Sequence, residues 1–516
     1  MLVKTYGAAV QGIDAIPVTI EVSIERGYAF MIVGLPDAAV KESYQRVLSA
    51  VKQAGIEFPR RHIVINMAPA DVKKEGAAYD LPFAIGILAA GELLPRVELL
   101  QEYVVMGELS LDGSVLPVRG VLPMAIMARK MGFKGMIVPR DNAHEAAVVN
   151  NLDVLGVDSL TQVVEFFKGN TVIEPTVVDT RREFAEAQFD FDIDFSEVKG
   201  QDNVKRAFEV AAAGGHNLLM VGPPGSGKSM MAQRLPTIMP PLTLAEALET
   251  TKIHSVAGKL RSNARLMTSR PFRAPHHTIS PVALVGGGTN PKPGEISLAH
   301  NGVLFLDEFP EYPRAVLEVL RQPLEDRHIS VSRARYSVDY PAGFMLVASM
   351  NPCPCGYYNH PTKECTCQPG AVAKYMSRIS GPLLDRIDLQ VEIYPVGFSS
   401  IADTRPSESS AEIRARVIRA RQMQEERFRD VKGVFCNAQM NKRLLNVHAA
   451  LGPEALELLR NAMERLDMSA RAYDRILKVA RTIADLDNSA SIETRHIQEA
   501  ISYRNLDRST WGATIG

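Results

Sequence analysis

Near the middle of the chain, the apolar stretch LLMV (218–221) precedes the glycine-rich octapeptide GPPGSGKS (222–229), and the helical pattern MMAQRL follows. A strand, a glycine-rich turn and a helix in this order are typical of a phosphate-binding loop, because glycines let the backbone approach the phosphates and the first N–H groups of the helix bind anions. Lys228 is expected to pair with the β- and γ-phosphates, and Ser229 to hold Mg²⁺. The loop residues predicted to contact a nucleotide are Gly222, Pro223, Pro224, Gly225, Ser226, Gly227, Lys228 and Ser229.

Two later strand ends carry polar side chains suited to the same kind of site. The run VLFLDE (303–308) predicts a buried strand ending in two carboxylates. Asp307 would anchor Mg²⁺ through water, and Glu308 would polarise the attacking water. The alternative, a strand that ends in a solvated acidic turn, is disfavoured by the phosphate-binding loop upstream. A further strand, FMLVASMN, ends in Asn351, which would reach the γ-phosphate or the water, although asparagine also commonly ends strands as a turn residue.

Two arginines complete the candidate set. Arg386 lies in GPLLDRIDL and Arg471 lies at the start of a predicted helix, in MSARAYDRI. Either would neutralise charge that develops on a transferred phosphoryl group, which is the role of an arginine finger. The alternative for each is a surface ion pair, for instance between Arg386 and Asp385 or Asp388. The residue pattern leaves both interpretations open.

The organisation of the chain follows from composition and periodicity, and its 516 residues allow two or three domains. The predicted parts are an α/β front domain at 1–168, a linker at 169–194, an α/β core at 195–396, a connecting helix at 397–434 and a helical domain at 435–516. The linker carries the acidic-aromatic run FDFDIDF. The connecting helix is expected to begin at the capping pair Ser409 and Glu412.

Charge and hydropathy restrict the partners and the cellular location that are expected for the protein. The net charge is −1, so no overall charge excess points to nucleic acid or membrane, although a locally basic groove is compatible with this balance. The first residues lack the pattern of a secretory signal peptide. The longest apolar run, at 81–90, is too short to cross a bilayer. We therefore expect a cytoplasmic protein.

Four of the five cysteines lie in two C-x-C pairs: Cys353, Cys355, Cys365 and Cys367. In a protein expected in the cytoplasm, such pairs favour a closed tetrahedral Zn²⁺ site over disulfides. His360 lies between the pairs and is an alternative ligand to one thiolate. The other interpretation is a loop with incidental thiols, because C-x-C is tighter than the usual C-x₂-C spacing. A metal here would hold together the loop that directly follows Asn351. The fifth cysteine, Cys436, is expected in the core.

The order of these motifs resembles that of the Mg-chelatase-like AAA+ proteins, and specifically the ComM/YifB family of bacteria. The resemblance covers essentially the whole chain. Its most specific stretches are VKGQDNVKRAFEVAAAGGHNLLMVGPPGSGKS, RPFRAPHHTISPVALVGGG, NGVLFLDEFPE, ASMNPCPCG and ISGPLLDRIDL. It implies an ATP- and Mg²⁺-dependent ring, a homo-hexamer, with each site shared between neighbouring subunits. Carried over, Lys228 and Ser229 are the Walker A contacts, and Asp307 and Glu308 are the Walker B pair. Asn351 is then sensor 1. Arg386 is the arginine finger, and Arg471 is the sensor 2 residue. The segment 198–201 is expected near the adenine.

About eighty residues separate Lys228 from Asp307, more than a strand–helix–strand unit needs. The stretch 261–294 therefore looks like an insertion within a helix, as in the chelatase and replicative-helicase branch of AAA+ proteins. A second segment, HISVSRARYSV (328–338), alternates apolar and polar residues and is expected to form a hairpin. In that branch both elements point into the central channel. Arg333 and Arg335 would then meet a DNA backbone, and the alternative is an exposed polar strand face.

The front domain is similar to the Lon-type protease fold, which is the fold of domain 2 of ribosomal protein S5. The matching stretches are KKEGAAYDLPFAIGIL and GELSLDGSVLPVRGVLPMAI. Peptidases of that fold use a serine–lysine pair, and the two positions fall here on Ala78 and Leu122. Neither residue is a nucleophile or a base, so a catalytically dead scaffold domain is expected.

Three functions remain as hypotheses. The first is a DNA motor that drives branch migration, as a helicase does, and supports recombination during natural transformation, as the family resemblance implies. The second is a magnesium-chelatase motor subunit, although such motors generally lack a front protease-like domain. The third is a protein remodeller, for which the expected aromatic–apolar–glycine loop is missing from PVALVGGG. No membrane partner is expected.

Overall fold

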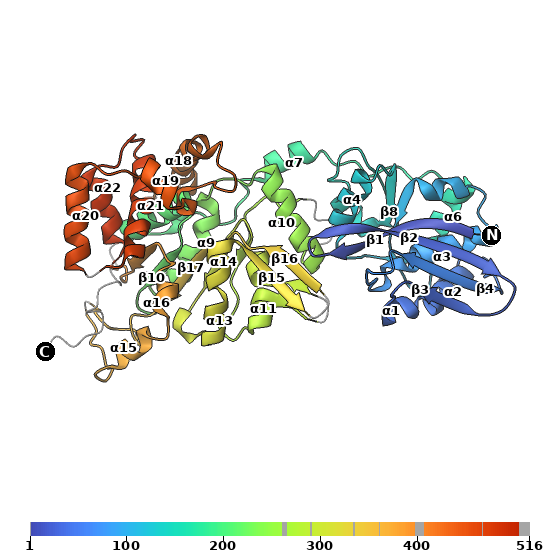
Figure 1. Ribbon diagram of the computed structural model, residues 1–516, viewed down its shortest axis with the longest axis horizontal. Helices are drawn as coiled ribbons and strands as arrows, with labels where there is room; N and C mark the ends of the chain where they lie inside the picture. The colour runs from blue at the N-terminus through green and yellow to red at the C-terminus, as the bar shows by residue number, and fades with distance from the viewer. Residues whose placement is uncertain are drawn as a thin grey trace. The chain divides into compact units, whose positions relative to one another are not determined.

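The computed structural model describes residues 2–260, 266–288, 291–333, 336–360, 362–397, 407–466 and 468–504. The chain forms two compact units (Figure 1). The first comprises Met1–Glu186, Leu244–Thr268 and Pro291–Pro293, and the second comprises Ala187–Thr243, Ser269–Asn290 and Gly294–Gly516. The front unit is therefore discontinuous in sequence.

The first unit is built on a seven-stranded mixed sheet with the order β3-β4-β2-β1-β5-β8-β9. Its strands are β1 (Leu2–Gln11), β2 (Asp14–Glu25), β3 (Phe30–Val33), β4 (His62–Ala68), β5 (Tyr103–Val105), β8 (Gly135–Pro139) and β9 (Asp153–Val157). Strands β1, β2 and β4 pair antiparallel, and β5, β8 and β9 pair parallel. Along β4, Ile63, Ile65 and Met67 are buried alternately, as expected when one face of a strand covers a core.

Helices supply the rest of this unit. They are α1 (Ala38–Lys41), α2 (Ser43–Gln53), α3 (Asp80–Ala90), α4 (Val121–Lys130), α5 (Arg140–Ala146) and α6 (Leu160–Lys168). Every residue of α3 is buried, because its sequence after Asp80 is apolar on all faces and the Asp80 carboxylate pairs with Arg46 at 2.6 Å. After β5 comes the short β6 (Glu108–Leu109), which pairs with β7 (Val115–Leu116). The chain leaves the main ladder at Gly107, whose N–H donates to the carbonyl of Ala78.

One helix of the first unit, α10 (Leu244–Ala257), lies in the sequence between the phosphate-binding loop and the VLFLDE run. Glu145 accepts hydrogen bonds from the Ser255 hydroxyl of α10 and, at 2.9 Å, from the Leu122 N–H at the start of α4. Burial raises the pKa of Glu145 above its ordinary value, and these hydrogen bonds oppose the shift. Lys252 adds a 2.6 Å ion pair with Asp14. These contacts attach α10 firmly to the front unit.

The second unit contains a five-stranded parallel sheet with the order β11-β14-β17-β10-β18. The strands are β10 (Leu218–Val221), β11 (Phe272–Arg273), β14 (Val303–Leu306), β17 (Met345–Met350) and β18 (Leu389–Glu392). Strands β10, β14 and β17 are buried throughout, as in parallel sheets with both faces covered. Since all five strands run in one direction, the polar residues that follow β10, β14 and β17 meet at one edge.

The helices and small elements around this sheet include α8 (Asp202–Gly214), α9 (Lys228–Ile238), α11 (Pro281–Val285), α12 (Glu295–Leu298), α13 (Arg314–Val319), α14 (Arg321–Asp326), α15 (Ala371–Met376) and α16 (Gly381–Leu384). The predicted hairpin is present as β15 (His328–Arg333) paired antiparallel with β16 (Tyr336–Pro341). Ile329, Val331 and Tyr340 are buried, which anchors the hairpin. The segment expected as a linker contains α7 (Thr180–Ala187).

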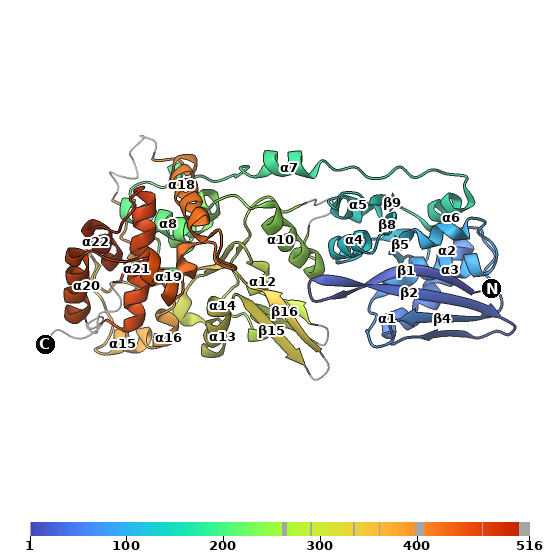
Figure 2. The same cartoon turned by 45° about the horizontal axis from the view of Figure 1, so that its top comes forward.

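The C-terminal part is helical, with α18 (Ser410–Phe428), α19 (Lys442–His448), α20 (Pro453–Arg465), α21 (Ala470–Leu486) and α22 (Thr494–Ser502). Helices α20, α21 and α22 lie side by side in both ribbon views (Figures 1 and 2). The capping box of Ser409 and Glu412 at the start of α18 is formed as predicted. The α/β fold class with a helical C-terminal domain is therefore confirmed.

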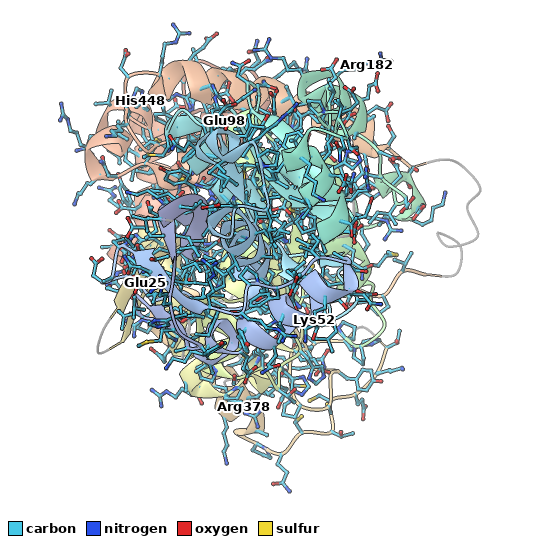
Figure 3. The ribbon with its side chains drawn as sticks, turned by 90° about the vertical axis from the view of Figure 1, so that its right-hand side faces the viewer. Glu25, Lys52, Glu98, Arg182, Arg378 and His448 are labelled. Atoms are coloured by element: carbon cyan, nitrogen blue, oxygen red, sulfur yellow. The ribbon has the colours of Figure 1, made fainter. Side chains whose placement is uncertain are left out.

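Charged side chains are mostly at the surface, as Glu25, Lys52 and Arg182 are in Figure 3. Among the helices of the described ranges, none is both long enough and apolar enough to pass through a bilayer.

Candidate active site

The phosphate-binding loop joins β10 to α9 as the sequence predicted. Gly227, the residue before α9, has φ +88°, a left-handed conformation that lets the chain turn sharply into the helix. The Lys228 ammonium donates to the carbonyl oxygens of Gly222 and Pro223 at 2.7 and 2.9 Å. Burial lowers the pKa of Lys228, and the nearby carboxylates of Asp307 and Glu308 oppose that shift. The carbonyl oxygens of the loop thus hold the Lys228 cation at the phosphate-binding loop.

The magnesium side of the site lies where β14 ends beside the loop. The Ser229 hydroxyl donates to Asp307 Oδ2 at 2.8 Å. Asp307 Oδ1 accepts from the hydroxyl of Ser349 in β17 and from the Glu308 N–H at 3.0 Å. A serine hydroxyl and a carboxylate are the oxygen ligands that Mg²⁺ takes beside nucleotide phosphates. Ser349 was not predicted as a site residue, since nothing in the sequence indicates that β17 neighbours β14.

Asn351 also reaches the loop. Its Oδ1 lies 3.3 Å from Lys228 Nζ, at the end of β17. The structure therefore brings Lys228, Ser229, Asp307 and Asn351 into one cluster. The strand order places β17 directly between β10 and β14, which is why Asn351 and Ser349 contact residues from both sides.

Glu308 lies at the edge of this cluster and has an unpredicted partner. Its backbone is left-handed, with φ +53°, and its side chain is 56% exposed. His277 Nδ1 lies 3.1 Å from Glu308 Oε2. The His277 ring packs against His276, with centroids 4.1 Å apart, and meets Tyr312 edge-on. In the sequence, His277 was singled out only as part of the stretch RPFRAPHH, which was assigned to an insertion rather than to the site.

The two candidate arginines lie away from this cluster. Arg386 is nearly buried and pairs with Glu325 of α14 at 2.5 Å, rather than with Asp385 or Asp388. Arg471, at the start of α21, is 66% exposed and lies 3.4 Å from Asp385. In the described ranges, no contact joins either arginine to the phosphate-binding loop. One turn after Arg471, Arg475 donates to the buried Asp388 at 2.8 Å.

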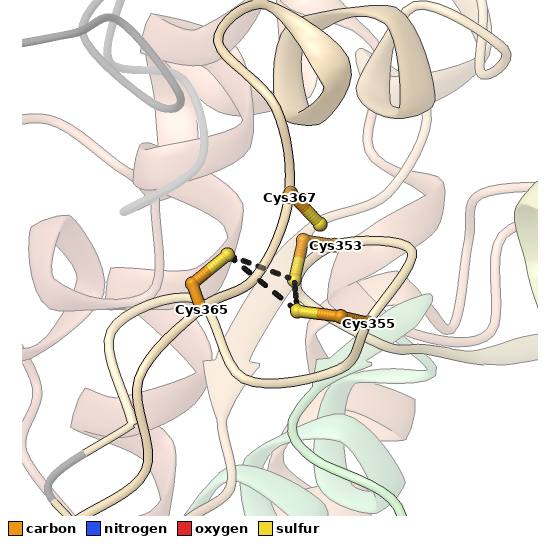
Figure 4. A group of neighbouring side chains, drawn as sticks. All are labelled: Cys353, Cys355, Cys365 and Cys367. Atoms are coloured by element: carbon orange, nitrogen blue, oxygen red, sulfur yellow. Dashed lines mark hydrogen bonds between the residues drawn. The ribbon is translucent and has the colours of Figure 1, made fainter.

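The four paired cysteines come together after Asn351 (Figure 4). All four Sγ atoms lie within 4.8 Å of one another. Cys353 Sγ lies 3.3 Å from that of Cys355 and 3.7 Å from that of Cys365. His360 is engaged elsewhere, because its Nδ1 accepts from the amides of Thr362 and Lys363 at 3.1 Å each. The arrangement is that of a closed four-thiol site for a soft metal ion.

The candidate DNA-contacting residues are Arg333 and Arg335. Arg333 ends β15, but its side chain lies outside the described residues, and so does Arg335.

Three family descriptions match the chain in succession. Residues 20–142 match "Subunit ChlI of Mg-chelatase", residues 194–401 match "Magnesium chelatase, subunit ChlI", and residues 407–504 match "Magnesium chelatase, subunit ChlI C-terminal". The second match contains the whole cluster around Lys228 and Asp307, and the third contains the C-terminal helices. This AAA+ family implies an ATPase that uses ATP and Mg²⁺ and works as an oligomer.

Relatives match over nearly the whole length. YifB of Escherichia coli is 44% identical over 506 residues, 97% of this chain and 96% of that protein. Competence protein ComM of Haemophilus influenzae is 42% identical over 509 residues, 98% of each chain. Lon protease of Rhizobium meliloti is 24% identical over 137 residues, 24% of this chain and 17% of that protein. The chain belongs to the ComM/YifB family of magnesium-chelatase-like AAA+ ATPases.

Proposed function

We propose that the protein is a ring-shaped ATPase that moves on DNA and drives branch migration, and thereby supports recombination of incoming DNA. The observation that carries the proposal is the β15–β16 hairpin, inserted between β14 and β17 with two arginines in its sequence. A two-stranded ribbon inserted between the strands that lead to Asp307 and Asn351 can transmit changes at the site to a polymer in the channel of the proposed ring. The name of the relative ComM, a competence protein, supports a role in DNA uptake.

In this proposal the roles at the site follow from position. Lys228 pairs with the β- and γ-phosphates, Ser229 and Asp307 hold Mg²⁺, and Glu308 polarises the attacking water. Asn351 orients the water or the γ-phosphate from the neighbouring strand. Together these groups supply charge stabilisation and positioning, which are the main contributions to phosphoryl transfer.

Arg386 and Arg471 are proposed to act on the nucleotide at the subunit interface of a homo-hexamer. Arg386 is the finger for the neighbouring subunit, and Arg471 is the sensor 2 residue. Mixing inactive Glu308→Gln subunits with inactive Arg386→Ala subunits tests this sharing. Partial recovery of hydrolysis is expected, because some interfaces then combine an intact Glu308 with an intact Arg386. No recovery at any mixing ratio contradicts a shared site.

The front unit is proposed to be a scaffold without peptidase activity, with Ala78 and Leu122 in the positions of the serine–lysine pair. The cysteine cluster is proposed to hold structural Zn²⁺ through Cys353, Cys355, Cys365 and Cys367. Elemental analysis of the purified protein is expected to give one zinc per chain.

Steady-state ATP hydrolysis by the full chain tests the main proposal. Rates are measured alone and with single-stranded, duplex and four-way-junction DNA, beside Glu308→Gln. We expect DNA to raise the rate and Glu308→Gln to abolish it. Replacing Arg333 and Arg335 together by glutamine should remove the stimulation and keep the basal rate. The control is Arg378→Gln, an exposed arginine paired with Glu311 at 2.8 Å.

The magnesium-chelatase motor is the second candidate, favoured by the three chelatase-subunit matches. Two results together would support it over the DNA motor: a Glu308→Gln variant that hydrolyses no ATP, and a wild-type ATPase rate that no DNA changes. Stimulation of hydrolysis by a chelatase partner subunit would then be the decisive result.

A further inference from the structure

The cysteine loop, residues 353–367, contacts the phosphate-binding loop. Gly356 lies between the two cysteine pairs with φ +85°, and a Cβ atom added to it would lie 2.8 Å from Pro224 Cδ. Cβ atoms do not occupy such short distances, so only glycine allows this approach. The loop is therefore packed directly against the Pro224 ring of the phosphate-binding loop.

The same loop lines a pocket beside the start of the phosphate-binding loop. Gly222 and Pro223 line it together with Gly356, Tyr358 and His360 of the cysteine loop and with Tyr394, just after β18. The Gln201 side chain donates to the Tyr394 carbonyl oxygen. Gln201 belongs to the segment 198–201, which was expected near the adenine, so the pocket lining contacts a residue expected near the base and includes the first residues of the phosphate-binding loop.

The wall that this loop forms has no helix or strand among its described residues. Between residues 353 and 367 the described residues form turns and irregular backbone, with hydrogen bonds such as Gly356 N–H to Cys353 O at 3.0 Å. The cysteine pairs lie at the two ends of the loop. The Tyr358 N–H, within the pocket wall, donates to Cys353 Sγ at 3.3 Å. Hydrogen bonds of this kind orient thiolate ligands and couple them to their surroundings.

A thiophilic divalent metal fits the cluster. Zn–S bonds of about 2.3 Å place neighbouring sulfurs of a tetrahedral site about 3.8 Å apart. The observed separations of 3.3, 3.5 and 3.7 Å among Cys353, Cys355 and Cys365 are close to this spacing. Because a metal bound at both ends of an irregular loop supplies its folding free energy, the loop's conformation depends on the ion.

We propose that the metal held by the four cysteines builds one wall of the nucleotide pocket, so that affinity for ATP and ADP depends on metal occupancy. The inference rests on the proposed ATPase site and the proposed zinc ion. Without metal, the loop samples other conformations, and the apparent dissociation constant rises in inverse proportion to the fraction that remains competent. Tyr358 is a pocket residue whose backbone N–H donates to the Cys353 sulfur of the cluster.

The test compares nucleotide affinity with metal content in the full-length protein. Binding of a fluorescent ADP analogue is titrated against wild type as purified, after chelator treatment under reducing conditions, and after re-addition of Zn²⁺. We expect stripping to weaken binding at least about tenfold and zinc to restore it. Far-UV circular dichroism should change little, because the loop has no regular secondary structure.

Two variants and a matched control separate the possible causes. Cys365→Ser should lose the metal and bind the analogue as weakly as stripped wild type. Tyr358→Ala should keep the metal and still weaken binding. Cys436→Ser, which changes the buried cysteine outside the cluster, should alter neither.

Each failure has its own signature. Loss of metal from Cys365→Ser with unchanged affinity overturns the inference and leaves the zinc proposal intact. Wild type that binds nucleotide tightly but contains no metal overturns both zinc and the inference. Metal-loaded wild type that binds no nucleotide contradicts the proposed ATPase site itself.

Discussion

Ser229 Oγ donates a 2.8 Å hydrogen bond to Asp307 Oδ2, which joins the first turn of α9 to the end of β14. Asp307 in turn accepts from Ser349 in β17. One carboxylate therefore ties three segments that are far apart in sequence. These hydrogen bonds fix the position of the Asp307 carboxylate, and such preorganisation is what an efficient magnesium site requires.

Replacing Asp307 by asparagine keeps the shape of this residue and removes its charge. We expect the Mg²⁺ concentration for half-maximal ATP hydrolysis to rise at least about tenfold, equivalent to about 1.4 kcal/mol. Titration of the ATPase rate with Mg²⁺ at fixed ATP measures the change. Asp339→Asn is the control, since Asp339 also accepts from a serine, Ser330 at 2.6 Å, but lies in the hairpin. An unchanged Mg²⁺ requirement in Asp307→Asn would contradict the assignment.

His277 is expected to position Glu308. The 3.1 Å contact restrains a carboxylate that is otherwise half exposed. We predict that His277→Ala lowers kcat roughly tenfold, within the range for a misplaced general base, and leaves KM for ATP nearly unchanged. His276→Ala is the matched control, because His276 contacts Thr278 instead of Glu308. Equal losses in both variants would indicate a structural role for the histidine pair.

The Arg386–Glu325 ion pair is expected to restrain the proposed finger. To reach a neighbouring nucleotide, Arg386 must leave Glu325, and a neutral partner lowers the cost of leaving. Glu325→Gln should therefore raise the ATPase rate of the assembled protein about twofold or more. Glu318→Gln, which removes the partner of Arg321, serves as the control. A slower Glu325→Gln enzyme would mean that Glu325 positions the finger instead of restraining it.

Lys478 of α21 should make stability depend on pH. Burial, reinforced by the nearby Arg475, lowers the pKa of Lys478 to about 8. Unfolded lysine titrates near 10.4, so between these pH values the unfolded state binds more protons and the free energy of unfolding rises with pH. The slope from this group is at most about 1.4 kcal/mol per pH unit.

Thermal unfolding of wild type and Lys478→Met at pH 7.5, 9 and 10 checks this dependence. The midpoint temperature of unfolding of wild type, minus that of Lys478→Met, should increase from pH 7.5 to pH 10. Lys442→Met, at an exposed lysine, should follow wild type at each pH. A difference between wild type and Lys478→Met that is constant with pH would show that the lysine does not titrate in this range.

Contiguous motifs explain what could be predicted from sequence. The phosphate-binding loop and the VLFLDE run each combine a strand pattern with the polar residues that follow, so local spacing was enough for Lys228, Ser229 and Asp307. The cysteine pairs were recognisable for the same reason, since the four cysteines lie within fifteen residues of sequence. The hairpin was predicted from its alternation of apolar and polar residues.

Contacts made by strand order could not be predicted in this way. Ser349 is one polar residue inside an apolar strand, and only the neighbouring position of β14 and β17 brings it to Asp307. His277 comes from a segment with no regular periodicity and reaches Glu308 because β11 pairs with β14. The sequence did not predict that α10 belongs to the front unit. Its buried residues include Thr250, Thr251 and His254, which give no apolar stripe.

The helix α10 also limits how such a protein can change by recombination of gene segments. A segment beginning at residue 195 would encode α10 without most of the front unit to which it belongs, and one ending at residue 186 would encode that part of the unit without α10. Buried residues such as Ile253 would be exposed in the first product and missing from the second. The front unit and the nucleotide-binding unit are therefore expected to be inherited together rather than exchanged as separate modules.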